Sequence, residues 1–563
     1  MTLQVTAKRL RDLVPVALWL LCLPAFCLPA FCQQPCCHTP PASPASSRER
    51  AILFVDLGTL HHRVSTHLPQ AQRFFDQGLT LVYAFNFPEA YRSFRRAAAL
   101  DPHLAMAYWG MALALGPNYN SPADPDIEKN AYPMAQKALA LRRFATAQER
   151  AYIDALARRF SAAPQADLKQ LDRDYAGAMR RVAQAYPDDL DAATLYAESL
   201  MELHPWQLWD SRGNPAEGTT ELVAVLESVL RRDPDHLGAN HFYIHAVEAS
   251  PHPEWALPSA DRIIALAPGA GHIVHMPSHI YMRVGDYESA ATCNEAAVAI
   301  DQAYFRRQPA RGEYRLYLAH NLNFLADARG MEGRFQDTLA AAREAVRARN
   351  PSLTQTPALD AQTTAPGLEL VRFGRWADVL RLKEPDRSQP IAHALWHYAV
   401  GVASAATGRA AEADRHCQAL GREASAIPAA ATVGLNTARD ILGLAHTVLS
   451  ARIARARRAP DKEIALLQKA VDLQDALGYD EPADWYYPVR ESLGGALLRA
   501  RRYAEAERVF RADLEKNPRS GRSLYGLMTS LSAAGRASEA ALVRAQFALA
   551  WRHADTALTV NAL

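Results

Sequence analysis

Residues 71–102 read AQRFFDQGLTLVYAFNFPEAYRSFRRAAALDP, which joins two helical patterns through a short turn. Small, aromatic and proline residues stand at fixed places in this stretch: Gly78, Ala90, Phe94, Ala97 and Pro102. Such spacing predicts a helix-turn-helix unit in which the small residues sit at close contacts between helices. A single unit buries only one face, so the stretch also predicts neighbouring units that stack on it.

The same spacing recurs near the C-terminus. A unit that starts at Tyr487 is followed by another with Gly535 and Ala540, and weaker units begin near Leu190 and Ala394. These units resemble the tetratricopeptide repeat, which has about 34 residues. The resemblance implies an all-α superhelical solenoid with a concave groove, and a protein or peptide partner in that groove. The matching residues of the unit at Tyr487 are Gly494, Tyr503, Ala506, Phe510 and Pro518.

The repeats divide the chain of 563 residues into four parts. We expect no strands in the repeat region, and we expect insertions between repeats near residues 117–150, 302–317 and 346–366. The four parts are a hydrophobic and Cys-rich N-terminal segment (1–37), a linker with a lead-in segment (38–70), the solenoid (71–550) and a C-terminal tail (551–563).

The N-terminal segment has the features of an export signal. Three basic residues between positions 8 and 11 precede an apolar run from Leu13 to Phe31 that is interrupted by prolines. A cleaved secretory signal is therefore favoured over a membrane anchor, and we expect an exported protein, periplasmic or secreted. A membrane association follows only if this segment stays uncleaved. Beyond it only Cys293 and Cys417 remain, so the sequence predicts no disulfide framework.

The composition excludes several classes of function. Lys and Arg total 62 against 60 for Asp and Glu, so the net charge of +2 gives no electrostatic reason for binding nucleic acid. The sequence contains no GxxxxGK[ST] phosphate loop and no GxSxG nucleophile motif, and its repeat region has no CxxC pair. Nucleotide hydrolysis and thiol chemistry are therefore unsupported.

Residues 271–285 read GHIVHMPSHIYMRVG and contain three histidines at helical spacings. The repeat register starts this unit at Gly271. At about 100° per residue, the residues expected to pack on neighbouring helices form one stripe, and the histidines form another, rotated by roughly 130°. In the repeat family this second stripe lines the concave groove, so we expect the histidines there. Pro277 lies within the same helix and predicts a local kink.

The two neighbouring repeats place further polar residues on this stripe. The preceding helix, residues 237–248, carries three of them at i, i+4 and i+7, and the following repeat contributes a histidine together with Asn323 and Asp327. The candidate ligands that we expect to converge are His241, His245, Glu248, His272, His275, His279 and His320.

Imidazole and carboxylate side chains are ligands for zinc, iron, copper or manganese, and helices build such sites from residues at i, i+3 or i+4. The stripe therefore predicts one or two transition-metal ions in the groove. The alternative is a metal-free groove that binds a peptide. If the protein is an enzyme, a metal-bound water is the expected nucleophile or oxygen ligand, Glu248 is a candidate base or ligand, and Arg283 is a candidate contact for an anionic group. These residue types are compatible with both hydrolysis and oxidation, so the sequence does not indicate which reaction occurs.

Three other groups of residues receive simpler interpretations. We expect His61, His62 and His67 in a solvated loop before the first repeat, and we expect His393 and His397 in the core or at a helix interface. The aromatic residues of the stretch DEPADWYYPVRES, residues 480–492, are expected to pack between helices.

Overall fold

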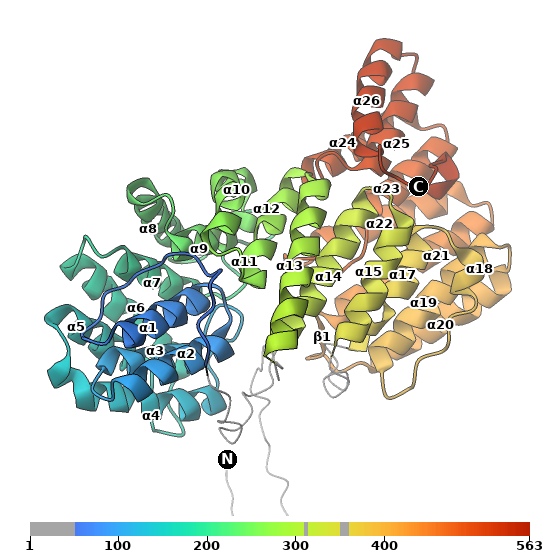
Figure 1. The fold of residues 1–563 in the computed structure, drawn as a ribbon. Coiled ribbons are helices and arrows are strands. Elements are labelled where there is room, and N and C mark those ends of the chain that lie inside the picture. The colour runs from blue at the N-terminus through green and yellow to red at the C-terminus, as the bar shows by residue number, and fades with distance from the viewer. Residues whose placement is uncertain (1–50, 309–313, 350–359) are drawn as a thin grey trace, which may run out of the picture. The chain divides into compact units, whose positions relative to one another are not determined.

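The computed structural model describes residues 51–308, 314–349 and 360–563, and almost all of their regular structure is helical (Figure 1). The segment expected to be an export signal, with its cysteines, lies outside the described residues. The helices up to residue 266 are α1 (Pro69–Tyr83), α2 (Phe87–Leu100), α3 (Ala105–Leu115), α4 (Pro125–Leu141), α5 (Ala147–Leu156), α6 (Leu168–Ala185), α7 (Leu190–Met201), α8 (Thr219–Arg232), α9 (Leu237–Glu248) and α10 (Leu257–Leu266). The middle of the chain forms α11 (Gly271–His275), α12 (Pro277–Val284), α13 (Tyr287–Arg307), α14 (Tyr314–Met331), α15 (Phe335–Ala348), α17 (Ala365–Arg372) and α18 (Trp376–Val379). The last part forms α19 (Pro390–Ala406), α20 (Ala410–Ala426), α21 (Ala438–Ala456), α22 (Pro460–Asp475), α23 (Val489–Arg499), α24 (Tyr503–Lys516), α25 (Gly521–Ala533) and α26 (Ala537–Ala550).

One small hairpin interrupts the helices of the described chain. Strands β1 (Thr432–Val433) and β2 (Asn436–Thr437) pair antiparallel, with Thr432 opposite Thr437. The expectation of a chain without strands was therefore wrong at this point. The reason is local, because Gly434 takes a φ of +57° at the turn and the Asp480 carboxylate accepts a hydrogen bond from Leu435 N at 3.1 Å.

Helices that follow one another in sequence pack as successive pairs, such as α1 on α2, α2 on α3, α13 on α14, α14 on α15 and α19 on α20. This order of contacts is that of an all-α solenoid of tetratricopeptide-type helix pairs. The segment that we expected to be an insertion at 117–150 contains α4, which packs on α3. Residues 309–313 and 350–359, within the other two expected insertions, lie outside the described residues.

The glycines of the repeat pattern sit where helices touch. A Cβ atom at Gly78 would lie 2.6 Å from Phe94 Cε1, and one at Gly110 would lie 2.4 Å from Phe94 Cδ1. The repeat at Tyr487 has the same arrangement, because a Cβ at Gly494 would lie 2.3 Å from Phe510 Cζ. The small residues Ala90, Ala97 and Ala506 are fully buried. These contacts confirm the helix interfaces predicted from the repeat register.

Two large apolar clusters stabilise the described chain. One extends from Ala51 to Ile280 and the other from Phe335 to Leu563, while α13, α14 and α15 also carry smaller clusters near the boundary of these two. The helices that carry the candidate ligands therefore stand at the end of the first cluster. This position brings them next to side chains of the second.

The lead-in segment is more tightly bound than the sequence suggested. We expected His62 in a solvated loop, but its Nδ1 atom lies 2.7 Å from Asp191 Oδ2. Ser65 N also donates to Glu149 Oε1 at 2.6 Å. The segment lies along the first repeats and contacts their carboxylates, so His62 lies in a loop as expected but is not solvated.

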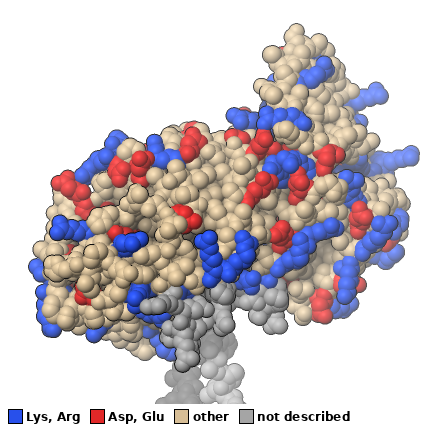
Figure 2. All heavy atoms as spheres, viewed as in Figure 1, with Lys and Arg blue, Asp and Glu red and all other residues tan. Residues whose placement is uncertain are grey.

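The charged side chains show no single-sign surface on the face in Figure 2, where Lys and Arg alternate with Asp and Glu. Many of them form ion pairs between helices, such as Arg180 with Glu221 at 2.6 Å. None of the helices in the described chain is both long and apolar enough to cross a membrane.

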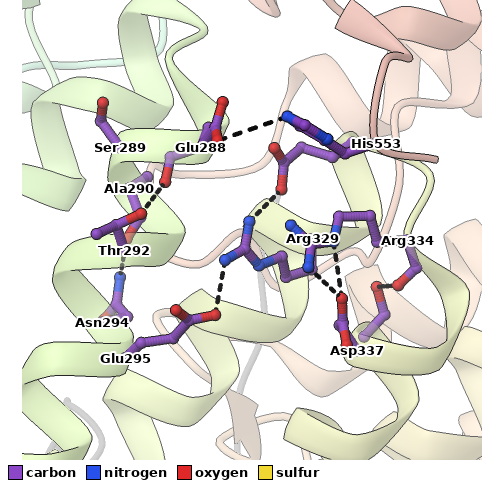
Figure 3. Close-up of polar contacts among 12 residues, drawn as sticks. Glu288, Ser289, Ala290, Thr292, Asn294, Glu295, Arg329, Arg334, Asp337 and His553 are labelled. Carbon is purple, nitrogen blue, oxygen red and sulfur yellow. Dashed lines mark hydrogen bonds and ion pairs between the residues drawn. The ribbon is translucent and has the colours of Figure 1, made fainter.

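The last repeat folds back onto the middle of the chain. The Tyr287 hydroxyl donates to Pro518 O at 2.9 Å, and Asp555 accepts hydrogen bonds from Phe335 N at 2.7 Å and Gln336 N at 2.9 Å. Figure 3 shows Glu288 of α13 facing His553, with 3.7 Å between Glu288 Oε1 and His553 Nε2. The repeat register did not predict this contact.

Candidate metal centre

Helix α9 supplies the first candidate ligands, and all of its residues are buried. His241, His245 and Glu248 lie on one face, as their spacing predicts. The Nδ1 atom of His241 lies 2.6 Å from Tyr83 O at the end of α1. Since a carbonyl oxygen only accepts, this Nδ1 carries the hydrogen and the Nε2 atom of His241 keeps its lone pair.

The next three histidines lie on two short helices. α11 ends at His275 and α12 begins at Pro277, in agreement with the expected kink. His272, His275 and His279 are all buried. We expected them to line an open groove, but they point into the interior between α9, α13 and α14. Their ring contacts with His241, His245 and Phe324 place them there.

Helix α14 completes the set with His320, which is half-buried. Its ring centre lies 4.8 Å from that of His275 and 6.0 Å from that of His279. The structure therefore brings all six predicted histidines together from four helices.

The six histidines form two groups. The first histidine group contains His241, His245 and His272, and the second histidine group contains His275, His279 and His320. Within each group one ligand atom from every residue lies within 4.8 Å of the others. The closest pair is Nε2 to Nε2 in both, at 3.2 Å between His241 and His272 and at 2.9 Å between His275 and His279.

Glu248 connects the two groups. Its Oε1 atom lies 2.7 Å from His245 Nδ1, and its Oε2 atom accepts a hydrogen bond from His279 Nδ1. A carboxylate that accepts from the outer nitrogen of an imidazole fixes the ring orientation and leaves Nε2 unprotonated. This arrangement favours a supporting role for Glu248 over the base or direct ligand that we considered from the sequence.

Asn294 has the same function for His275. Its Nδ2 atom donates to Ala290 O at 2.8 Å, so its Oδ1 atom faces His275 Nδ1, also at 2.8 Å. The hydroxyl of Ser278 donates to His275 O at 2.7 Å and is not available to Nδ1. His275 Nδ1 must therefore donate to Asn294, and its Nε2 atom is a lone-pair nitrogen.

Two lone-pair nitrogens consequently face each other at 2.9 Å, one from His275 and one from His279. The Nε2 atom of His245 is buried and has no hydrogen-bond partner among the described residues. Buried polar atoms without partners cost free energy, and two opposed lone pairs repel each other. A cation coordinated by these nitrogens relieves both problems.

Burial disfavours protonation of five of the six rings. Burial lowers the pKa of His241, His272 and His275 well below the ordinary value, and it lowers the pKa of His320 to about 3. Burial also lowers the pKa of His245, although Glu248 opposes the shift. Burial raises the pKa of Glu248, but His279 and His245 outweigh it and the net shift is downward. These five imidazoles are therefore neutral beside an ionised carboxylate.

The segment that contains Tyr479 and Glu481 is remote from α9 in sequence but contacts Glu248. The Tyr479 hydroxyl lies 3.2 Å from Glu248 Oε2 and 3.0 Å from Glu481 Oε1. We expected the aromatic residues nearby to pack between helices, which holds for Tyr486 against Tyr398. The contact of Tyr479 was missed, because no local pattern relates it to α9.

A cavity of about 280 Å³ adjoins both histidine groups. Burial raises the pKa of Asp480 to about 6 and raises those of Glu481 and Asp484 well above their ordinary values. The cavity lining includes His245, His272, His279, His320 and Glu481.

Arg283 lies beside the centre rather than in the cavity lining. Its Nη2 atom donates to Ser250 O at 3.3 Å, and its guanidinium lies 5.4 Å from the centre of the Tyr479 ring. Asp327, predicted on the polar stripe, lines the cavity and lies 3.5 Å from Arg372 Nη1.

His393, which forms the other predicted histidine pair with His397, differs in protonation from the histidines of the two groups. Each ring nitrogen of His393 lies 2.9 Å from a carboxylate, one of Glu423 and one of Glu384. Burial lowers the pKa of His393, but the two glutamates outweigh it and raise the pKa. His397 lies at the interface of α19 and α20, as expected, with its Nδ1 atom 2.8 Å from His416 Nδ1. An imidazolium held between two carboxylates has no lone pair for a metal.

No family model matches the sequence, and no curated protein is significantly similar to it. Solved structures align with most of the chain. The human IFIT1 dimer with m7Gppp-AAAA is 12% identical with a TM-score of 0.32, covering 86% of this chain and 90% of that chain. Yeast Tom70 is 11% identical with a TM-score of 0.28, covering 83% and 89%. The TPR domain of P58(IPK) is 12% identical with a TM-score of 0.21, covering 83% and 99%. These superpositions are loose, so the repeat assignment rests on the helix pairs and glycine contacts described above.

Proposed function

We propose that this protein binds transition metal through its buried histidines and acts on a small molecule that enters the adjoining cavity. The observation that carries the proposal is the 2.9 Å separation of the Nε2 atoms of His275 and His279, both of which have their hydrogens on Nδ1. Imidazoles whose Nε2 atoms converge in this way are placed to coordinate a cation.

The supporting contacts strengthen the proposal. Metal-binding histidines usually donate their outer nitrogen to a carboxylate or a carbonyl oxygen. Here His241 donates to Tyr83 O, while His245 and His279 donate to Glu248. These hydrogen bonds restrict the side chains of the histidines and do not contribute to packing between the repeats. A role in orienting metal ligands explains why they are present.

Access by a small molecule separates this proposal from simple metal storage. His245, His272, His279 and His320 line the cavity, so an ion held by these residues faces it. A metal ion with an open position binds water or substrate there and polarises it. The proposal therefore includes a metal-dependent reaction on a molecule that fits about 280 Å³.

Elemental analysis of the protein, purified without an affinity tag, tests metal binding directly. We expect near-stoichiometric zinc, copper or iron in the unmodified protein and a loss of at least tenfold in the double variant His245→Ala/His279→Ala. The matched control is His61→Ala/His252→Ala, which changes two histidines with side chains 60% and 53% exposed and should retain the metal. Equal metal contents in both double variants, or no metal in the unmodified protein, would leave the metal-free peptide groove as the better interpretation.

We also propose that the protein is exported, on the basis of the basic residues and the apolar run that ends at Phe31. Sequencing of the mature N-terminus should find it between about residues 25 and 40, where signal cleavage is expected. Recovery of the uncleaved chain from the cytosol would contradict the proposal.

A further inference from the structure

We propose that the centre is dinuclear, with one transition-metal ion in the first histidine group and a second ion in the second histidine group. This inference rests on the proposed function, because it presumes that the histidines bind metal. It goes further by assigning two ions, their separate ligands and a common open side.

Each group is complete by itself. Metal–nitrogen distances of about 2.0 to 2.1 Å place two ligands of a tetrahedral ion about 3.3 Å apart. The Nε2 separations of 3.2 Å between His241 and His272 and of 2.9 Å between His275 and His279 are close to that value. His245 and His320 supply the third nitrogen of the respective groups. Three imidazoles and one open position are a known donor set for a catalytic ion.

A single ion does not account for all six rings. A four-coordinate ion uses at most four of them and leaves the Nε2 atoms of the others buried without a hydrogen-bond donor. The orphaned Nε2 atom belongs to His245 in the first group, whereas the opposed lone pairs belong to His275 and His279 in the second. Both groups therefore show a separate need for a cation.

Glu248 accounts for the pairing of the two groups. One of its oxygens holds His245 and the other holds His279, so a single carboxylate orients one ligand of each ion. The ring centres of these two histidines are 5.5 Å apart, and those of His272 and His275 are 5.7 Å apart. Adjacent groups at this spacing allow one small ligand to bind both ions.

The open sides of the two groups face the same cavity, which His245 and His272 line from one group and His279 and His320 from the other. The ligand class is therefore a small oxygen or nitrogen donor that bridges two cations. Because the donors of both groups are imidazole nitrogens and both oxygens of Glu248 face outer nitrogens, the set suits copper or zinc better than manganese, which prefers carboxylates.

The test counts copper in the full chain after metal removal, incubation with excess Cu(II) and dialysis. All variants are made in a parent protein that already carries His397→Ala and His416→Ala. These two histidines are removed because their Nδ1 atoms lie 2.8 Å apart and offer copper a binding site outside the centre. We expect two copper ions per chain in the parent. Adding His272→Ala should leave one, adding His320→Ala should leave one, and adding both should leave none. Adding His252→Ala, which alters an exposed histidine, should leave two.

Electron paramagnetic resonance gives an independent measurement. Two Cu(II) ions this close interact magnetically, so the parent should give a broadened signal or one of less than two spins per chain. Each single addition should give an ordinary mononuclear spectrum of one spin per chain. Circular dichroism checks that the variants fold. If a variant does not fold, the copper content and the spectrum of the parent still test whether the centre is dinuclear.

The outcomes separate the two proposals. One copper ion in the parent, lost equally on addition of His272→Ala or His320→Ala, would overturn the dinuclear centre and leave metal binding intact. Two ions without magnetic interaction would also overturn it, because the groups would then be independent sites. A parent that retains no copper, and no zinc in the same experiment, would overturn both the dinuclear centre and the proposed function.

Discussion

The hydroxyl of Tyr479 lies 3.2 Å from Oε2 of Glu248, although the two residues are 231 positions apart. Glu248 belongs to α9 and holds two of the histidines, whereas Tyr479 precedes α23 in the second half of the chain. The contact therefore connects the C-terminal repeats with the histidine centre. It also encloses the carboxylate, so that burial and the two histidines together set its pKa.

Replacing Tyr479 by phenylalanine removes this hydroxyl and leaves Glu248 and Glu481 with one hydrogen bond fewer. We expect the free energy of unfolding to fall by about 1 to 2 kcal/mol, since a buried acceptor loses its donor. Urea unfolding followed by circular dichroism measures the change. Tyr503→Phe is the control, because Tyr503 is half-buried and its hydroxyl makes no hydrogen bond recorded for the described chain. Equal losses in the two variants would mean that the contact does not stabilise the protein.

Replacing Glu248 by glutamine keeps the size of the side chain and removes its charge. One of the two acceptor oxygens becomes an NH₂ group, which no longer accepts from the Nδ1 atom of His245 or His279. Loss of such a supporting contact typically lowers metal affinity by about 10 to 100-fold. Competition with a chelator measures the affinity. Glu254→Gln, which changes a 50% exposed partner of His252, should have no effect. An unchanged affinity in Glu248→Gln would show that the carboxylate does not support the ligands.

The repeat interfaces predict opposite effects at two glycines. In α23, Gly494→Ala places a methyl group against Phe510, at 2.3 Å from Cζ before any shift. We expect a loss of about 1 to 3 kcal/mol from overpacking. In α21, a Cβ at Gly443 meets nothing within 4 Å, so Gly443→Ala should gain up to about 1 kcal/mol from helix propensity. Midpoints of thermal unfolding compare the two. A loss at Gly443 as large as that at Gly494 would contradict the packing explanation.

The contact between His62 and Asp191 predicts a dependence of stability on pH. Burial lowers the pKa of His62, but the hydrogen bond and the charge of Asp191 outweigh it, and the pKa rises above 6.5. Burial raises the pKa of Asp191, but His236 and His62 outweigh it and lower the pKa. The histidine stabilises the fold fully below its unfolded pKa and ceases to do so as pH rises through its raised folded pKa. The carboxylate stabilises the fold above its unfolded pKa, near 4, and ceases to do so as pH falls through its lowered folded pKa.

The stabilisation by this pair is therefore largest between about pH 4 and 6.5. We expect His62→Gln to lower the urea midpoint more at about pH 5.5 than at about pH 8.5. His103→Gln, which changes an exposed histidine beside Phe144, should show no such difference. If the loss for His62→Gln is the same at both pH values, the ion pair does not contribute to stability.

Several features follow from the sequence alone. The spacing of Gly78, Ala90 and Phe94 determines a helix pair, because packing within one repeat depends on residues that are close in sequence. The placement of His241, His245 and Glu248 on one face follows in the same way from the helical period. The histidine face was therefore predictable, and so was its convergence across neighbouring repeats.

Other features were decided only by the tertiary structure. The sequence gives no indication of which ring nitrogen meets Glu248 or Asn294, because that depends on the distance and rotation between helices. It also does not show that Tyr479 reaches Glu248 or that Asp555 caps α15, since each contact joins residues from distant parts of the chain. The repeat period specifies contacts between neighbours in sequence. Contacts between distant repeats depend on the small rotations accumulated along the array, which no short stretch of sequence contains.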